Sequence, residues 1–375
     1  MELFFDVVFV FAVTQLSHLL LGHLTAAGAL QTLLVLLAVW WAWMDTAWVT
    51  NWLDPGRRAT RVMLLGAMLA SLLMAAAVPE AFTDRGLVFA LAYAAIQVGR
   101  TVFMIWATRE DVALRTNFVR FLAWRSTAAA FWIAGGVAHE TLRTALWIVA
   151  VLIDCSGPLL YFVVPWLGRS HIEDWSIAGD HLAERCQLFL IVAFGESVLV
   201  TGATLSNLTW TASTVTGVAV CFAGTAALWW IYFDASAERG TQVISASQTP
   251  GRLGRSAYTY WHLPMVAGII VTAVGNELVI AHPGGESTTA TATTLTVVGG
   301  PLLFLSGHAL FKRTVFGHLS TQRVVAVAVL VALVPVGLNG PPLLLASLVL
   351  TIVGGVAIAD AALNRSGRSR STGVE

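Results

Sequence analysis

Charged residues and cysteines are scarce in this chain. Only 11% of its 375 residues are charged, whereas soluble domains average about 25%. Hydrophobic residues make up 57%, and the mean hydropathy is +0.77. So few polar residues could not cover a soluble globule, and the same shortage excludes disordered, collagen-like and nucleic-acid-binding chains. The isolated Cys155, Cys186 and Cys221 form no disulfide framework or zinc motif. The composition leaves a polytopic membrane protein.

The chain also lacks the short strings that hold common cofactors or catalytic groups. It has no Walker loop, no His-Glu-x-x-His and no Gly-x-Ser-x-Gly string. His18, His262 and His308 show no spacing typical of haem ligands. We therefore expect no cofactor, no metal and no nucleic-acid partner. The expected partners are the lipid bilayer and a small-molecule substrate of unknown identity.

Long apolar runs fill most of the sequence. A helical span needs about 20 mainly apolar residues, and runs bounded by charge, Gly and Pro give twelve of them. These continuous runs differ from the short alternating strands of a membrane barrel. The sequence therefore predicts an all-α polytopic membrane protein with about twelve transmembrane helices, at residues 2–22, 31–53, 60–80, 86–108, 117–137, 142–165, 182–204, 211–235, 257–280, 292–311, 323–339 and 341–363.

The positive charges alternate between the two sides of these twelve spans. Seventeen of the 21 Lys and Arg residues fall on one side and only Arg85 and Arg143 on the other, while Arg100 and Arg125 lie inside spans. Lys and Arg are retained on the cytoplasmic side of membrane proteins. The bias therefore predicts that both termini are cytoplasmic.

Three strings in the first half of the sequence match three strings in the second half, in the same order. Each half then contains six of the expected spans, and because six is an even number the two halves have the same orientation in the membrane. This predicts a parallel repeat about an axis along the membrane normal, as in several transporter classes. Its parts are a first half at 1–165, a cytoplasmic linker at 166–180, a second half at 181–363 and a cytoplasmic tail at 364–375. The matching strings are 40–45 with 229–234, 68–73 with 265–270, and 99–103 with 307–311.

Three strings resemble those of a known family. The opening Glu-Leu-Phe-Phe-Asp at 2–6, the His-x-x-Glu-Arg at 181–185 with the Gly-Glu-Ser at 195–197, and the Gly-His-Ala-Leu-Phe at 307–311 are similar to motifs of the bacterial low temperature requirement protein A family. The resemblance runs from residue 2 to about 363. It implies a protein embedded in the bacterial inner membrane, and the family name records a need for growth in the cold, but no settled activity comes with it. Family members usually carry a short segment before the opening motif, so we expect a start that is not complete.

Several ionisable residues fall inside the expected spans. Each costs about 2.5–3.5 kcal/mol at mid-bilayer unless it finds a partner. For Glu196 the sequence leaves two interpretations open, a group that titrates or contacts substrate and a protonated carboxyl bonded to a helix carbonyl. Asp154 precedes Gly157-Pro158, which indicates a sixth span that is either broken at mid-membrane or simply kinked. The candidates for a substrate or proton pathway are Glu196, Asp154, Asp6, Asp45, Asp234, Arg100 and His308.

The two arginines inside spans need different partners. Arg100 lies about fifteen residues into its span, which at about 1.5 Å per residue leaves it short of the interface. We therefore expect it to contact an aspartate, with Asp6 or Asp45 favoured over Asp234. Arg125 lies closer to the end of its span, and we expect its side chain to reach the interface more easily.

Three functions fit these observations. The first is a secondary transporter or permease, because the chain has two six-span halves, buried acids and no ATP-binding motif. The second is a membrane-embedded enzyme acting on a lipid or lipid-linked substrate, with His181, Glu184 and Arg185 at the inner face. The third is a structural or sensory protein whose buried charges hold helices together. Paired charges without a cavity would favour the third.

Overall fold

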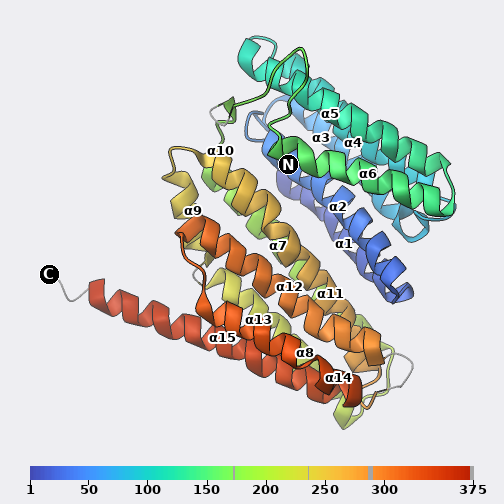
Figure 1. The fold of residues 1–375 in the computed structure, drawn as a ribbon, viewed down its shortest axis with the longest axis vertical. Coiled ribbons are helices and arrows are strands. Elements are labelled where there is room, and N and C mark those ends of the chain that lie inside the picture. Colours follow the sequence, from blue (N-terminus) through green and yellow to red (C-terminus); the bar gives the residue numbers. More distant parts are fainter. Residues whose placement is uncertain (172–173, 235, 286–289, 372–375) are drawn as a thin grey trace. The chain divides into compact units, whose positions relative to one another are not determined.

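Helices form nearly all of this computed structural model, which describes residues 1–171, 174–234, 236–285 and 290–371 (Figure 1). Within those residues, eleven helical segments are long and apolar enough to cross a membrane. A further helix, α5 (Val112–Val137), has 26 residues and is long enough to cross, although three arginines lower its hydropathy. The predicted all-α polytopic membrane fold is confirmed.

The chain divides into two compact units. Unit 1 contains Met1–Arg185 and Gln248–Arg255, and unit 2 contains Cys186–Ser247 and Ser256–Glu375. The helix α7 (Gly179–Ser206) begins in unit 1 and continues in unit 2.

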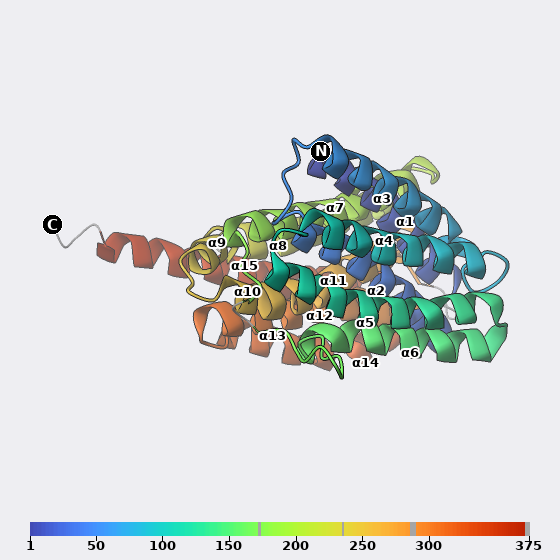
Figure 2. The ribbon, with the colours of Figure 1, turned by 90° about the horizontal axis from the view of Figure 1, so that it is seen from above.

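Six long helices make up most of unit 1. Helix α1 packs against α2 and α3, and the series α3, α4, α5 and α6 packs each helix against the next, while α2 contacts α4 and α6. Helices α5 and α6 lie side by side in both views (Figures 1 and 2). The Thr25 side chain caps α2, and Asp111 caps α5. The helices other than α5 are α1 (Glu2–Gly22), α2 (Ala26–Val49), α3 (Arg58–Ala77) with the short η1 (Val78–Glu80), α4 (Gly86–Ala107) and α6 (Glu140–Leu159).

Unit 2 is built around the pair α11 and α12, which approach each other closely. A Cβ atom on Gly268 would lie 2.6 Å from the Gly300 carbonyl oxygen, so glycine is required at this crossing. Helix α8 packs against α15 and α11, and α13 packs against α12 and α15. The elements of unit 2 besides the end of α7 are α8 (Ala212–Phe233), α9 (Ser236–Ser245), α11 (His262–Ala281), α12 (Ala290–Phe316), α13 (Thr321–Ala332), α14 (Val334–Asn339) and α15 (Pro342–Ser371). The short α10 (Pro250–Leu253) belongs to unit 1, and the π-helix η3 (Gly254–Tyr260) begins in unit 1 and ends in unit 2.

Two expected spans differ in detail. The sixth was expected to run over 142–165 and to break or kink near Asp154, but α6 is helical through Asp154 and ends at Leu159. Pro158 lacks the N–H that would extend the ladder, and the Phe162 N–H donates to the Gly157 carbonyl at 2.9 Å. The eleventh span, which contains Pro335, is divided into α13 and α14.

Candidate functional site

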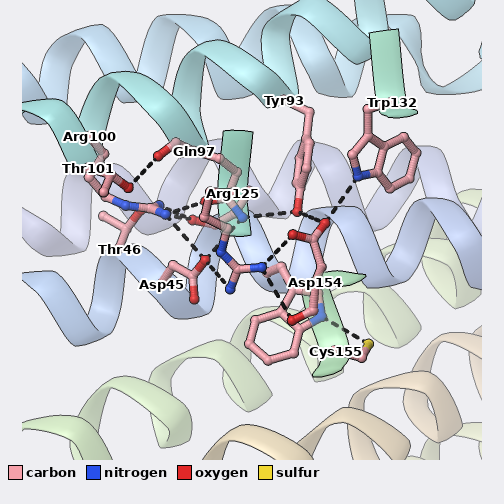
Figure 3. Close-up of polar contacts among 12 residues, drawn as sticks. Asp45, Thr46, Tyr93, Gln97, Arg100, Thr101, Arg125, Trp132, Asp154 and Cys155 are labelled. Atoms are coloured by element: carbon pink, nitrogen blue, oxygen red, sulfur yellow. Dashed lines mark hydrogen bonds and ion pairs between the residues drawn. The ribbon is translucent and has the colours of Figure 1, made fainter. Parts of the chain in front are cut away.

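Four charged side chains meet in the interior of unit 1. Asp45 on α2, Arg100 on α4, Arg125 on α5 and Asp154 on α6 form what we call the unit 1 charge network (Figure 3). All four are buried. The formal charges of two arginines and two aspartates cancel, which is the condition under which buried charge is tolerated.

One carboxylate oxygen of Asp45 joins the two arginines. Its Oδ2 lies 2.7 Å from Arg125 Nη2 and 3.3 Å from Arg100 Nη2. The same oxygen accepts a hydrogen bond of 3.0 Å from Gln97 Nε2. Any change in the charge of Asp45 would therefore act on both arginines together.

Asp154 is held by three donors from two neighbouring helices. Arg125 Nη1 donates to Oδ1 at 2.5 Å, and the Tyr93 hydroxyl and Trp132 Nε1 donate to Oδ2 at 2.7 and 3.1 Å. Gln97 Nε2 also donates to the Tyr93 hydroxyl at 2.9 Å. Tyr93 and Gln97 therefore link the two carboxylates, and charge-assisted bonds of this kind are the strong ones.

The arginines are positioned by their helices. Tyr93, Gln97 and Arg100 follow at four- and three-residue spacing, so they share one face of α4. Arg100 also donates to the Thr46 hydroxyl at 2.7 Å and to Gln97 Oε1. The Arg125 guanidinium lies 4.9 and 4.8 Å from the ring centroids of Trp41 and Phe121, a cation–π arrangement.

A second polar contact of unit 1 joins α1 to the start of α7. Arg185 donates to both carboxylate oxygens of Asp6, at 2.7 and 2.9 Å, and Trp43 Nε1 donates to Asp6 Oδ1 at 2.7 Å. His181 Nε2 lies 2.8 Å from Glu2 Oε2. Both pairs are separated by 179 residues, so two parallel helices meet at two points one turn apart. The opening motif and the His-x-x-Glu-Arg motif thus bind each other.

Unit 2 contains its own buried group, which we call the unit 2 polar cluster: Tyr232, His262, His308, Arg323 and Asp360. The Tyr232 hydroxyl lies 2.8 Å from His262 Nε2. Arg323 Nε donates to His308 Nδ1 at 3.1 Å, and its Nη2 lies 2.5 Å from Asp360 Oδ2. Because His308 Nδ1 accepts a hydrogen bond, its ring proton belongs on Nε2 in the neutral form.

The structure brings together three of the seven predicted pathway residues, Asp45, Arg100 and Asp154. The predicted contact of Arg100 with Asp45 is confirmed. Asp6 is paired with Arg185 instead. Arg125, whose side chain was expected to reach the interface more easily than that of Arg100, is instead buried between Asp45 and Asp154.

The remaining candidates, Asp234, Glu196 and His308, belong to unit 2. Asp234 was expected inside the membrane, but it follows the last residue of α8 and is exposed. Glu196 is buried on α7 in unit 2, and His308 belongs to the unit 2 polar cluster. The proposed enzymatic group does not assemble, because His181 and Arg185 are engaged by acids of α1 and Glu184 is exposed.

Sequence reasoning missed several members of these sites. Arg185 and Arg323 were counted among loop charges, yet both are buried and paired. Arg143, counted on the outer side, is also buried and donates to backbone carbonyls of Gly135 and Ala81. The helical spacing of Tyr93, Gln97 and Arg100 could have indicated a polar face on α4.

Within the described residues, no group of three or more His, Cys, Asp or Glu side chains could hold a metal ion.

A family model described as Bacterial low temperature requirement A protein (LtrA) matches residues 1–358. The chain is 40% identical over 333 residues to an uncharacterized protein of Rhizobium meliloti (strain 1021), an alignment that covers 88% of this chain and 81% of that protein. No solved structure matches the chain.

Proposed function

The chain belongs to the bacterial low temperature requirement A family. From its helical membrane architecture and its buried polar networks, we propose that it is a secondary transporter or permease for a small molecule. Its place is the bacterial inner membrane. The proposal is supported by polar networks inside membrane-spanning helices, which in such proteins mark substrate and ion pathways.

One observation carries the proposal further. In unit 1, the buried Arg125 of the fifth long helix, α5, pairs with Asp154 of the sixth, α6. In unit 2, the buried Arg323 of α13 pairs with Asp360 of α15, and these are the fifth and sixth spans of that unit. The helix neighbours also agree. The second span contacts the fourth and the sixth in both units, as α2 contacts α4 and α6 and as α8 contacts α12 and α15. The third to sixth spans pack each against the next, as α3, α4, α5 and α6 in unit 1 and as α11, α12, α13 and α15 in unit 2. These matches support the parallel six-helix repeat on which many transporters are built.

The unit 1 charge network offers a mechanism for proton coupling. It is neutral when both aspartates are ionised. A proton on Asp45 would leave Arg100 and Arg125 with a single carboxylate between them, so the site would gain one positive charge and attract an anion. Release of the proton would restore the pairing and expel the anion. This charge balance supports our proposal of a proton-coupled carrier for a small anion.

The test is untargeted metabolite uptake and efflux in a strain that lacks the gene, with and without a proton gradient. We expect the wild-type chain to restore movement of an anionic metabolite that Asp45→Asn does not restore. Asp234→Asn, at an exposed position, is the matched control and should behave as wild type. Equal restoration by Asp45→Asn would exclude the carboxylate from the transport step.

A structural or sensory role is the second candidate, favoured by the pairing of four of the buried arginines with carboxylates. The four arginines Arg100, Arg125, Arg185 and Arg323 each have a carboxylate within 3.3 Å. Under this alternative, Asp45→Asn would lower the melting temperature of the detergent-purified protein, and no metabolite would depend on the chain.

The positive charges support a topology with both termini in the cytoplasm. Reporter fusions after residues 58, 112, 172, 245, 318 and 370 should all report the cytoplasm. Fusions near 25, 208, 286 and 340 should report the outside. One reproducible reversal would refute the twelve-span topology.

A further inference from the structure

An apolar groove of about 550 Å³ runs between α3 and α4 in unit 1. Its volume falls in the range of roughly 300–1,000 Å³ that is typical of small-molecule sites. Small side chains line much of it, among them Gly66 and Ala70 on α3 and Ala95 and Gly99 on α4. Both helices are membrane spans, so whatever fills the groove comes from the lipid phase.

The groove is open where its glycines lie. No heavy atom lies within 4 Å of the position that a Cβ atom would take on Gly66 or on Gly99. The inner wall includes Arg100, whose charge is already balanced by Asp45. The groove is therefore suited to a hydrocarbon chain rather than to a second charged group.

Positive charge gathers at one end of the groove. Ala59, Val62 and Trp106 mark that end, and Arg58 lies four residues before Val62 on the same face of α3. Arg61 is exposed in the same turn. Arg109 lies 5.5 Å from the Trp106 ring centroid.

The backbone at this end adds to the positive potential. Helix α3 begins after Arg57 without a side-chain cap, so its first N–H groups remain available to an anion. The adjoining loops hold three acids: Asp54 accepts from the Gly56 N–H at 2.7 Å, Asp111 caps α5, and Glu110 is exposed beside Arg109. Within the described part of the chain, the arginines Arg58, Arg61 and Arg109 therefore face one acid that has no hydrogen bond of this local kind. An anionic group placed here would meet both the arginines and the helix end.

We propose that this groove is a binding site for an anionic phospholipid, with one acyl chain between α3 and α4 and the phosphate group at Arg58, Arg61 and Arg109. Charge complementarity selects the occupant, because basic clusters beside membrane helices favour lipids with a net negative charge over zwitterionic ones. This site shares Arg100 with the unit 1 charge network, but the lipid proposal does not depend on the proposed transport function.

The test measures melting of the full-length protein in detergent with added phosphatidylglycerol, phosphatidylcholine or inorganic phosphate. A ligand that binds the folded state raises the melting temperature. We expect phosphatidylglycerol to raise it by several degrees, and the other two to leave it unchanged. Native mass spectrometry should show retained phosphatidylglycerol.

Variants then locate the site. Gly66→Leu and Gly99→Leu fill open space and should each abolish the shift and the retained lipid. Gly202→Leu is the matched control, because Gly202 is an exposed glycine of α7 with equally open surroundings, and it should keep both. The double variant Arg58→Gln, Arg61→Gln should raise the phosphatidylglycerol concentration for half the shift at least tenfold.

Three results would overturn the proposal. An equal shift with phosphatidylcholine would remove the headgroup selectivity. An equal shift with inorganic phosphate would show an anion site without a lipid. An unchanged shift in Gly66→Leu and Gly99→Leu would place the lipid elsewhere. None of these bears on metabolite transport, so the two proposals can fail separately.

Discussion

The two units bury charge in different ways. In unit 1, two arginines and two aspartates share a network in which Asp45 contacts both cations. In unit 2, one arginine and one aspartate form a single pair, and the imidazole of His308 takes a hydrogen bond from Arg323.

The difference follows a rule of charge balance. Arg100 and His308 occupy matching places in the two Gly-x-x-x-Phe strings, and Asp45 and Asp234 occupy matching places after the aromatic strings. Where the arginine is present, its aspartate is buried against it; where the arginine is replaced by histidine, the aspartate is exposed. A buried charge without a partner is costly, so the aspartate is buried only where the matching arginine is present.

The largest expected effect is the difference in stability loss between a variant of Arg125 on α5 and a variant of Arg323 on α13. Arg125→Leu leaves Asp154 buried without its cation and Asp45 with Arg100 alone, and breaking such a buried pair costs about 3–5 kcal/mol. Arg323→Leu should cost less, because the Asp360 side chain is 13% exposed and can reach water. Unfolding of both variants in the same detergent gives the comparison. A larger loss in Arg323→Leu would show that exposure does not set the cost.

The next effect is the coupling between pairs. Residues in direct contact show interaction energies of about 0.5–3 kcal/mol in double-mutant cycles, whereas separated ones add. We expect coupling for Arg185→Leu with Asp6→Leu and for Arg100→Leu with Asp45→Leu. Arg100→Leu with Asp6→Leu should be additive, since Asp6 is bound by Arg185. Thermal melting of each single and double variant measures this.

Part of the fold and of the site could be predicted from the sequence. Apolar runs of bilayer length define helices whatever their neighbours, so the spans were predictable. The depth of Arg100 in its span, together with the cost of a bare buried charge, pointed to an aspartate such as Asp45. Both inferences need only the distance along one helix.

The rest depends on which helices are neighbours. Arg125 and Asp154 meet because α5 packs against α6, and nothing in either span specifies that packing. Arg185 and Arg323 lie near helix ends, where a base that turns inward has the same sequence pattern as one that faces the interface. Asp45 and Asp234 share a motif position but differ in exposure, because α8 ends before Asp234 whereas α2 continues past Asp45.

A smaller effect compares the two buried tyrosines. Tyr93→Phe removes a hydrogen bond to the Asp154 carboxyl group, which is paired with Arg125, and bonds to charged groups are worth about 1.5–3 kcal/mol. Tyr232→Phe removes a bond to the neutral His262, which is worth about 0.5–1.5 kcal/mol. The melting temperature should therefore fall more in the first variant. Equal losses would indicate that the unit 1 charge network is not ionised.

The smallest effect is expected at Asp234. Its carboxylate lies at the C-terminal end of α8, where the helix dipole disfavours negative charge, and just before the start of α9 (Ser236–Ser245), where the dipole favours it. These contributions oppose each other, and the residue is exposed. Asp234→Asn should therefore change the free energy of unfolding by no more than about 0.5 kcal/mol. Asp45→Asn removes the negative charge between two buried arginines and should change the free energy of unfolding several-fold more. Melting both variants side by side tests the charge-balance rule directly. A loss at Asp234 as large as that at Asp45 would mean that the matching acids have equivalent roles, and it would refute the charge-balance rule.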